Sequence, residues 1–351
     1  MKSLSRELSR VPEGGLGEDQ RLAPLFPAGC PVTVEAWEEQ RASLRREWDR
    51  VLGKPSFESF DQAVEVVGRF EQPEYRGTLV RQPTGPHTRQ LLLLMEPARA
   101  TRSPRPGAVV PFYHPDAMAG YDLEKGEPIR ERPVVQFGRH LVQQGYVVVC
   151  SEAFPFNTVP HPGTEAGFAW WHAGAKKLLQ DNPQWTGMGK LAWDASRALD
   201  FLLEQPDVDP ERILMIGHSL GGKIAFYAGV LDERVRAVIG SDFGIGWSFT
   251  NWDAPWYLGE QIHHPEFPLA HHQLLALLAP RSFLLIGGEA DRVESWQYLK
   301  AAQEVYRLYG REDAVGHFYH GTGHSPTPES LEIAYRWLAE QFGLPEEAWT
   351  L

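Results

Sequence analysis

The sequence has only two cysteines, Cys30 and Cys150, in 351 residues. Two cysteines cannot build the dense disulfide framework that holds many small secreted proteins together. Cys150 closes the apolar run Tyr146-Val-Val-Val-Cys150, a pattern typical of a buried and inert thiol. The 42% of hydrophobic residues instead permit a large hydrophobic core.

Long apolar runs and basic clusters are also lacking. No stretch approaches the roughly 18 uninterrupted apolar residues of a membrane-spanning helix, and the first residues do not contain the apolar segment of a signal peptide. The net charge is −12, and no run of lysine and arginine marks a surface for nucleic acid or membranes. We therefore expect a cytoplasmic protein that binds neither, and a homo-oligomer is compatible with the sequence.

No motif for a nucleotide cofactor is found, and metal-ligand patterns are weak. The pairs His263-His264 and His271-His272 stand eight residues apart, which does not match the usual zinc spacings, and few carboxylates lie nearby. We expect no metal ion and no cofactor.

From residue 108 onward, apolar strand patterns alternate with helical patterns. This alternation predicts an α/β fold with a mostly parallel central sheet and helices on both faces. Extended segments within 63–96 predict an antiparallel edge. The expected strands lie at 108–113, 146–150, 212–217, 235–240, 282–287 and 316–319, and the expected helices at 133–144, 188–205, 220–231, 272–278, 294–309 and 328–342.

The N-terminal part differs in composition from the rest. Residues 1–30 are polar with scattered Gly and Pro and predict an irregular arm. Thr33 can cap a helix over 34–52 with an apolar stripe at Trp37, Leu44, Trp48 and Val51. We therefore expect an N-terminal arm and helix, residues 1–60, packed on a catalytic domain of residues 61–351. Two irregular, aromatic-rich inserts, 151–187 and 243–269, interrupt that domain.

The most informative stretch is Gly217-His218-Ser219-Leu220-Gly221, between an apolar strand and a helical pattern. It is a G-x-S-x-G motif in the strand–turn–helix context that a nucleophilic serine requires. Such a serine sits on a strained turn, so the residues two positions to either side must be small for strand and helix to approach. Ser219 is the predicted nucleophile, at the positive end of a helix.

A base and an acid should follow at the carboxyl ends of later strands. The order Ser219, Asp291, His324 is the Ser…Asp/Glu…His order of α/β hydrolases. Histidine can take the serine proton and return it to the leaving group, and a carboxylate fixes the tautomer of the imidazole. Asp291 is the preferred acid, although it could instead pair with Arg292 or cap the helix after it. Glu289 and Asp242 remain alternative acids, and His320 an alternative base.

The oxyanion site needs backbone N–H groups directed at the developing charge. One should come from Leu220, directly after the nucleophile, and the other from the loop Tyr113-His114-Pro115-Asp116. Because Pro115 has no N–H, His114 is the first choice and Asp116 the second.

Several stretches carry a family resemblance: Gly187-Met-Gly-Lys-Leu-Ala-Trp-Asp194, Asp207-Val-Asp-Pro-Glu-Arg-Ile213, Gly217–Gly222, Leu274-Leu-Ala-Leu-Leu-Ala-Pro-Arg281 and the loops of Asp291 and His324. Together they resemble α/β-hydrolase esterases of the branch that contains acetyl xylan esterases, cephalosporin-C deacetylases and dienelactone-hydrolase-like proteins. The Leu-Leu-Ala-Pro-Arg281 segment and the following helix, Trp296–Gly310, are also similar to glucuronoyl esterases. The resemblance covers roughly residues 60–345.

The resemblance implies the α/β-hydrolase fold and a serine-dependent carboxylic ester hydrolase with a small ester substrate, leaning to short-acyl esters of carbohydrates. A peptidase, thioesterase or lactonase with the same triad is the alternative enzyme, and a non-catalytic binding protein the alternative class. Two features depart from the families. The oxyanion loop has His114-Pro115 where a His-Gly pair is usual, and the elbow lacks the Cys-Ser-Arg form of glucuronoyl esterases.

Aromatic residues crowd the two inserts. Aromatic faces over a cleft suit sugar rings or other planar groups, and lid packing is the equally weighted alternative. The candidates for substrate contact are Trp170, Trp171, Trp247 and Trp252, with His218 beside the nucleophile.

Overall fold

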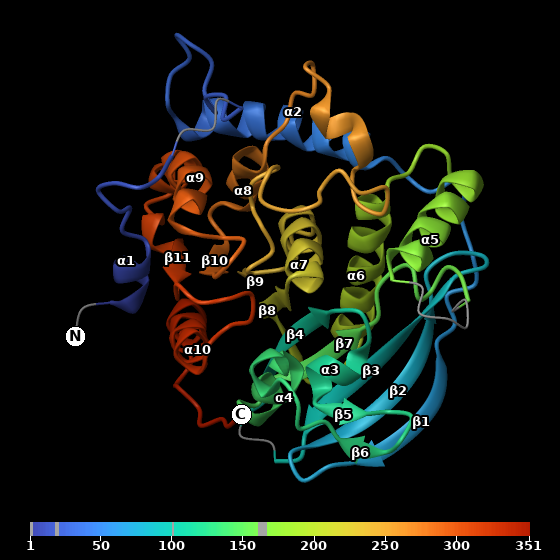
Figure 1. The fold of residues 1–351 in the computed structure, drawn as a ribbon. Helices are drawn as coiled ribbons and strands as arrows, with labels where there is room; N and C mark the ends of the chain where they lie inside the picture. The colour runs from blue at the N-terminus through green and yellow to red at the C-terminus, as the bar shows by residue number, and fades with distance from the viewer. Residues whose placement is uncertain (1–2, 18–20, 100–101, 161–166) are drawn as a thin grey trace.

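A computed structural model describes residues 3–17, 21–99, 102–160 and 167–351 (Figure 1). Its centre is a nine-stranded sheet in the order β1-β2-β3-β7-β4-β8-β9-β10-β11. The strands are β1 Glu65–Glu71, β2 Tyr75–Pro83, β3 Arg89–Pro97, β4 Arg105–Pro111, β7 Val147–Ser151, β8 Val208–His218, β9 Ala237–Ser241, β10 Ser282–Gly287 and β11 Val315–Tyr319. A separate two-stranded sheet joins β5 Tyr121–Asp122 to β6 Glu127–Pro128.

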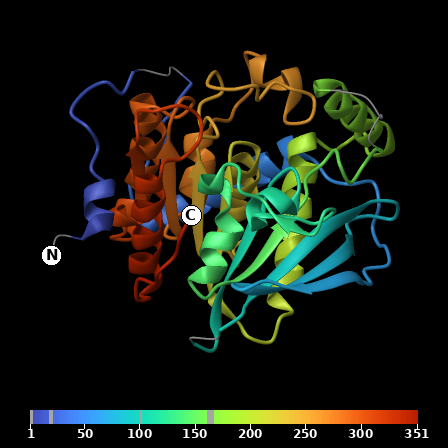
Figure 2. The ribbon, with the colours of Figure 1, turned by 60° about the horizontal axis from the view of Figure 1, so that its bottom comes forward.

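The strand directions confirm a mostly parallel sheet with an antiparallel edge. The ladder from β7 through β4, β8, β9 and β10 to β11 is parallel. β1, β2 and β3 pair antiparallel, as do β3 and β7, and Figure 2 shows these edge strands at one end of the sheet. The carboxyl ends of the parallel strands therefore share one edge, where a site is expected in such a sheet.

Helices cover both faces of the sheet, each over its own hydrophobic core. One core joins the sheet to α2, α5, α6, α7, α8 and α9, and the other joins it to α1, α3, α4 and α10. The helices are α1 Leu4–Leu8, α2 Val34–Leu52, α3 Pro115–Ala119, α4 Phe137–Gln143, α5 Phe168–Asp181, α6 Gly187–Leu203, α7 Leu220–Leu231, α8 His271–Leu278, α9 Trp296–Leu308 and α10 Pro328–Phe342. Short 3-10 turns are η1 Pro133–Val135, η2 Gly259–His263, η3 Val293–Ser295 and η4 Glu312–Ala314. No helix of the described residues has the length and apolarity needed to cross a membrane.

The predicted N-terminal helix is confirmed as α2. The Thr33 hydroxyl accepts from the N–H of Ala36 at 3.3 Å, as an N-cap does, and Trp37 and Trp48 of its apolar stripe are fully buried. α2 packs on α8, across the outside of the helical layer (Figure 1). The helix prediction holds because cap and stripe agree within the same segment.

The expectation of an irregular arm over residues 1–30 is wrong at α1. Ser3 caps this short helix by accepting from the N–H of Arg6. The N–H of Ser5 donates to Glu340 of α10 at 3.1 Å, and Leu8 is buried. Tertiary contacts with α10 and β11 stabilise a helix that is too short to be stable in isolation.

The expectation that residues 151–187 are irregular is also wrong, because they contain α5; residues 161–166 lie outside the described part. Trp171, Ala175 and Leu178 fall on one buried face of α5, at a helical spacing. The helix begins after Gly167 without a side-chain cap, so the sequence carries no start signal for it.

A buried polar cluster ties this insert to the body of the molecule. Lys190 of α6 is within 2.5 Å of both carboxylate oxygens of Asp194, and both side chains are almost fully buried. Asn157 donates to the same carboxylate at 2.7 Å, and Lys190 donates to the Thr84 hydroxyl at 3.2 Å. Two buried charges are tolerated at this position because they neutralise each other and find further hydrogen-bond partners.

Candidate active site

Ser219 occupies the turn between β8 and α7 in a strained conformation. Its φ is 54° and its ψ −114°, a region that residues other than glycine rarely adopt. The N–H of Ser219 donates to the carbonyl of Ser241 at 2.8 Å, which fixes the turn to the end of β9. Ser219 precedes the first residue of α7, where the helix dipole favours negative charge.

Gly217 and Gly221 of the motif must be glycine because a side chain at either position would collide with neighbouring backbone. A Cβ on Gly217 would lie 2.1 Å from the backbone of Gly221, and a Cβ on Gly221 would lie 2.1 Å from the carbonyl oxygen of Pro111. The second contact sets the start of α7 directly against the end of β4. The expectation that small residues let strand and helix approach is confirmed, and the elbow is brought next to the loop after β4.

His324 is hydrogen-bonded to Asp242. The Nδ1 atom of His324 lies 2.6 Å from Oδ2 of Asp242. Asp242 directly follows β9, is fully buried, and has a positive φ of 44°. Backbone N–H groups of Gly288, Ala290 and Asp291 donate to Oδ1 of this carboxylate at 2.8–3.0 Å. Burial opposes the charge of Asp242, but the hydrogen bonds from His324 and from these N–H groups lower its pKa below the ordinary value.

The structure corrects the expected pairing of Asp291 with His324. Oδ2 of Asp291 accepts from the N–H of Gly244 and Oδ1 from the N–H of Ile245, each at 2.7 Å. The Ser295 hydroxyl donates to Oδ1 at 2.9 Å. Asp291 therefore binds backbone N–H groups of the loop after β9. Asp242, which the sequence analysis kept as an alternative acid, is the partner of His324. The physical reason is the turn at Asp242, whose positive φ no sequence rule foresees.

Glu289 and His320, the remaining candidates for acid and base, have different surroundings. Glu289 is exposed, and its N–H donates to Oδ2 of Asp242 at 3.2 Å. Nδ1 of His320 lies 2.7 Å from the Thr322 hydroxyl. Neither side chain is paired with His324 in the described part of the structure.

The side chain of His218 is buried against the ring of His324. The expectation that His218 contacts the substrate is therefore corrected. Its Nδ1 lies 3.2 Å from the Ser241 hydroxyl, and its ring centroid is 4.6 Å from that of His324. Burial, together with the neighbouring His324, lowers the pKa of His218 to about 3. A neutral imidazole below His324 adds no charge that would repel a protonated His324. The contact also places His324 beside the residue that precedes Ser219.

The expected oxyanion donors lie around the same edge. Leu220 is the first residue of α7, so its N–H has no partner within the helix. His114 is the N-cap residue of α3 and Asp116 lies in its first turn. Backbone N–H groups at the start of a helix have no acceptor within the helix. Because Gly221 lies against Pro111, the start of α7 and the loop 112–116 are neighbours. The choice between His114 and Asp116 stays a prediction.

The four candidate tryptophans fall into two groups. Trp170 and Trp171 of α5 lie near the loop after β4. The Trp171 ring is 5.7 Å from that of Tyr113, and the Trp170 ring is 4.5 Å from that of Phe156, which in turn is 4.3 Å from the ring of His114. The contact of Trp170 with substrate stays a prediction, whereas Trp171 is only 7% exposed and presents little of its ring.

Trp247 and Trp252 are instead core residues, and the expectation that they contact substrate is corrected. Their ring centroids lie 3.8 Å and 4.5 Å from the ring of His271, and both side chains are buried. Their indole nitrogens donate to the carbonyls of Leu269 and Gly244. At this pair the insert packs into the main core against α7 and α8, not into a small core of its own.

The paired histidines also have protein partners. Nε2 of His271 lies 2.7 Å from the Tyr227 hydroxyl and its Nδ1 lies 2.6 Å from the carbonyl of Ile245. Within the described ranges, no group of three or more His, Cys, Asp or Glu is arranged to hold a metal ion.

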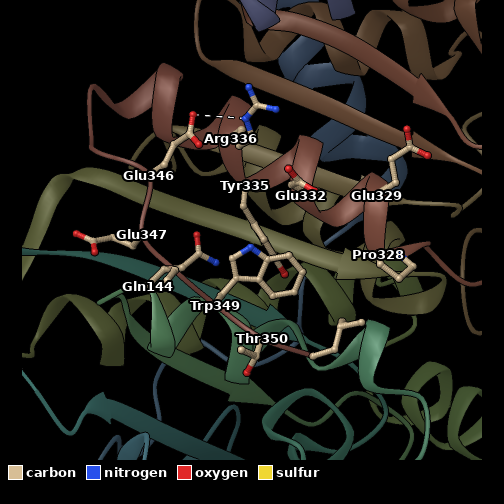
Figure 3. A pocket seen from close by; sticks show the side chains of 12 residues that line it. Gln144, Pro328, Glu329, Glu332, Tyr335, Arg336, Glu346, Glu347, Trp349 and Thr350 are labelled. Carbon is tan, nitrogen blue, oxygen red and sulfur yellow. Dashed lines mark hydrogen bonds and ion pairs between the residues drawn. The ribbon is translucent and has the colours of Figure 1, made fainter.

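A cavity of about 540 Å³ lies between α10 and the C-terminal residues (Figure 3). Tyr335 and Trp349 form part of its wall, and Arg336 pairs with Glu346 across it at 3.4 Å. Its lining contains none of Ser219, Asp242 and His324, so this cavity is separate from the elbow.

Comparison with known proteins finds similarity to esterases in the part of the chain that contains Ser219 and Asp242. A family profile described as "Glucuronyl esterase, fungi" matches residues 177–253, a span that includes Ser219 and Asp242. The chain is 24% identical to the carbohydrate esterase MZ0003 of an unknown prokaryotic organism over 48% of this chain and 44% of that protein. It is 26% identical to the 4-O-methyl-glucuronoyl methylesterase of Neurospora crassa, over 40% of this chain and 44% of that protein. The chain thus spans less than half the length of these two relatives.

A similarity of full length is found to the hydrolase YtaP of Bacillus subtilis, 26% identical over 85% of this chain and 100% of that protein. Among solved structures, a glucuronoyl esterase from Solibacter usitatus superposes with a TM-score of 0.67 at 20% identity, covering 95% of this chain and 99% of the other. A promiscuous esterase of carbohydrate esterase family 15, from a marine bacterial metagenome, gives 0.68 at 18% identity, covering 95% and 98%. The α/β-hydrolase fold and the resemblance to esterases of that fold are confirmed, and the similar sequences include a glucuronoyl methylesterase, a carbohydrate esterase and YtaP.

Proposed function

We propose that this protein is a serine-dependent carboxylic ester hydrolase that uses Ser219, His324 and Asp242. The observation that carries the proposal is the 2.6 Å pair of His324 and Asp242, beside a serine held at φ 54° at the start of a helix. A buried carboxylate, an imidazole and a strained serine from three different loops are the parts that acyl transfer requires.

Each residue has a defined step. The Ser219 hydroxyl attacks the acyl carbonyl while His324 takes its proton, and Asp242 holds the imidazole tautomer and stabilises the cation that forms. The N–H of Leu220 and one N–H of the loop 114–116 stabilise the oxyanion, assisted by the dipole of α7. His324 then gives the proton to the leaving alcohol. Water, activated by the same imidazole, releases the acid from Ser219.

The substrate class that the similarities support is an ester of a carbohydrate. The relatives MZ0003 and the Neurospora protein are a carbohydrate esterase and a methylesterase of a glucuronoyl ester. The half-buried Trp170 packs on Phe156, which contacts His114 of the loop after β4, so a sugar ring could stack on Trp170 near that loop. Short-acyl sugar esters place the sugar on the alcohol side. Glucuronate esters, favoured by the profile match over 177–253, place it on the acyl side.

An ester panel tests both statements. It contains 4-nitrophenyl acetate, acetylated sugars, a glucuronate methyl ester and a peptide amide, and each is offered to the wild-type protein and to Ser219→Ala. Ester hydrolysis that disappears in Ser219→Ala is the expected result. Turnover that survives Ser219→Ala, or a preference for the amide, contradicts the proposal, and the better sugar ester decides on which side the sugar binds.

A further inference from the structure

Among the described residues, three other than glycine have a positive φ: Ser219 at 54°, Asp242 at 44° and Arg132 at 48°. A side chain in this region costs free energy, and such residues persist where the surrounding structure enforces them, often at functional sites. The first two are the proposed nucleophile and acid. Arg132 stands in a different part of the chain, directly before η1, and takes no part in the acyl-transfer steps of the triad.

The Arg132 guanidinium nevertheless lies at the same site. Its Nη2 donates to the Ser325 hydroxyl at 3.4 Å, and Ser325 follows His324. Burial, His324 and then the charge of Arg132 lower the pKa of His218, the neighbour of Ser219. Partial burial raises the pKa of Tyr113, in the loop after β4, and the charge of Arg132 opposes that rise. The hydrogen bond to Ser325 therefore places the Arg132 guanidinium beside the histidine loop, and its charge is felt both by His218 and by Tyr113 of the oxyanion loop.

This guanidinium is available to a ligand. Arg132 is exposed, and a hydrogen bond of 3.4 Å occupies one of its five donors only weakly. Arg139, by contrast, is committed to Glu74 at 2.6 Å. No carboxylate of the described ranges lies within ion-pair distance of Arg132. A planar fork of free donors suits a carboxylate, which it can bind through two parallel hydrogen bonds.

The position also indicates which part of the substrate the guanidinium meets. His324 returns a proton to the leaving alcohol, so the alcohol half of the ester lies on the side of His324. The contact with Ser325 places Arg132 on that side. We propose that Arg132 is a specificity-determining residue that binds a carboxylate carried by the alcohol half of the ester substrate; the proposal rests on the proposed function.

The test needs variants that keep the backbone. Asparagine tolerates a positive φ better than most residues, so Arg132→Asn removes the charge without adding strain. Arg132→Lys keeps the charge. Arg130→Asn is the matched control, because Arg130 is also exposed, stands two residues earlier and has no place in the catalytic machinery.

Two acetate esters present the alcohol half with and without a negative charge: the acetate ester of 4-hydroxybenzoate, and that of methyl 4-hydroxybenzoate, in which a methyl group removes the charge. We expect the preference of the wild-type protein for the anionic ester, measured as a ratio of kcat/KM values, to fall about fivefold in Arg132→Asn, mainly through KM. Arg132→Lys keeps the charge but lacks the planar fork, so its ratio should lie between those of wild type and Arg132→Asn. Arg130→Asn should stay within about twofold of wild type, and added salt should shrink the wild-type preference. If the anionic ester is turned over too slowly, its inhibition constant against 4-nitrophenyl acetate provides the same comparison.

Two outcomes overturn the role of Arg132, and a third overturns the proposed function on which it rests. An unchanged ratio in Arg132→Asn means that the guanidinium does not contact the alcohol half. An equal loss of kcat on both esters means that it acts at the reacting carbonyl instead. Hydrolysis that persists in Ser219→Ala contradicts the proposed function rather than the role of Arg132.

Discussion

The carboxylates of Asp242 and Asp291 each accept hydrogen bonds from the loop that carries the other. Asp242 accepts from the N–H groups of residues 288–291 at 2.8–3.2 Å. Asp291 accepts from those of Gly244 and Ile245 at 2.7 Å. The loops after β9 and β10 are thereby locked together, and Asp242 is held beneath His324. Asp291 is a positioning residue in this arrangement, and Asp242 is the one in contact with the base.

The first prediction compares the two aspartates in catalysis. Asp242→Asn removes the carboxylate that orients His324, and kcat for 4-nitrophenyl acetate should fall by roughly 10³–10⁴-fold, as expected when the acid of a triad is lost. Asp291→Asn leaves the hydrogen bond of His324 intact, so kcat should fall by about tenfold or less once the folded fraction is taken into account. Equal losses in the two variants would contradict the assignment of Asp242.

The second prediction concerns pH and the free energy of unfolding. Burial raises the pKa of Asp291 to about 6, above the 3.8 that it has when exposed. Between these values the folded protein binds the extra proton, so the stabilisation contributed by this group is present at low pH and is lost as pH rises through about 6. The unfolding free energy of wild type minus that of Asp291→Asn should therefore fall as pH rises from about 4 to about 6, and change little above that range.

Urea unfolding at several pH values measures that difference. Asp313→Asn, at a half-exposed carboxylate beside Arg311, is the control for the effect of replacing an aspartate as such. A difference for Asp291→Asn that grows with pH would show that the folded protein prefers the ionised carboxylate, contrary to the effect of burial on this group.

The third prediction concerns the elbow glycines. Gly217→Ala would bring a Cβ within 2.1 Å of the backbone of Gly221, where no flexible side chain can move aside. The expected cost is about 3 kcal/mol or more, or failure to fold. Gly14→Ala has nothing within 4 Å of the added Cβ and should leave the thermal midpoint within a degree or two. A stable and active Gly217→Ala protein would mean that strand and helix are not in contact at the turn.

The fourth prediction concerns the buried pair of Lys190 and Asp194. Lys190→Met leaves an unpaired buried carboxylate and should lower the unfolding free energy by about 3–5 kcal/mol. Adding Asp194→Leu should recover a large part of that loss, because a buried ion pair and an apolar pair of similar size are often nearly equal in stability. A double variant as unstable as the sum of the single variants would contradict this, because it would mean that Lys190 and Asp194 do not stabilise each other.

Much of the fold followed from local signals in the sequence. The elbow, the parallel strands and the helix over 34–52 were predictable because apolar period, glycine placement and capping residue agree within each segment. α1 and α5 were missed because their stability comes from tertiary contacts, with α10 for the first and with the insert's own aromatic packing for the second. No short-range pattern reports such contacts.

The site was predictable in part for the same reason. Ser219 and His324 stand in loops with clear sequence signatures. The choice between Asp242 and Asp291 depended on which carboxylate turns toward the imidazole, and a single positive φ at Asp242 decides it. Trp247 and Trp252 look like Trp170 and Trp171 in sequence, and only the placement of His271 among their rings makes them core residues. Arg132 does not belong to a recognisable motif. Only its positive φ and its hydrogen bond to Ser325 indicate a role at the site.

The central claim is that Ser219 is activated through His324 by Asp242, and covalent labelling tests it most directly. A fluorophosphonate probe is added to wild type, Ser219→Ala, Asp242→Asn and Asp291→Asn, and the labelling rate and the labelled peptide are followed by mass spectrometry. This mechanism predicts rapid labelling of Ser219 in wild type, none in Ser219→Ala, labelling slowed by roughly 10³-fold in Asp242→Asn and a rate near wild type in Asp291→Asn. Folded wild-type protein that stays unlabelled, or Asp242→Asn protein labelled as fast as wild type, would contradict it.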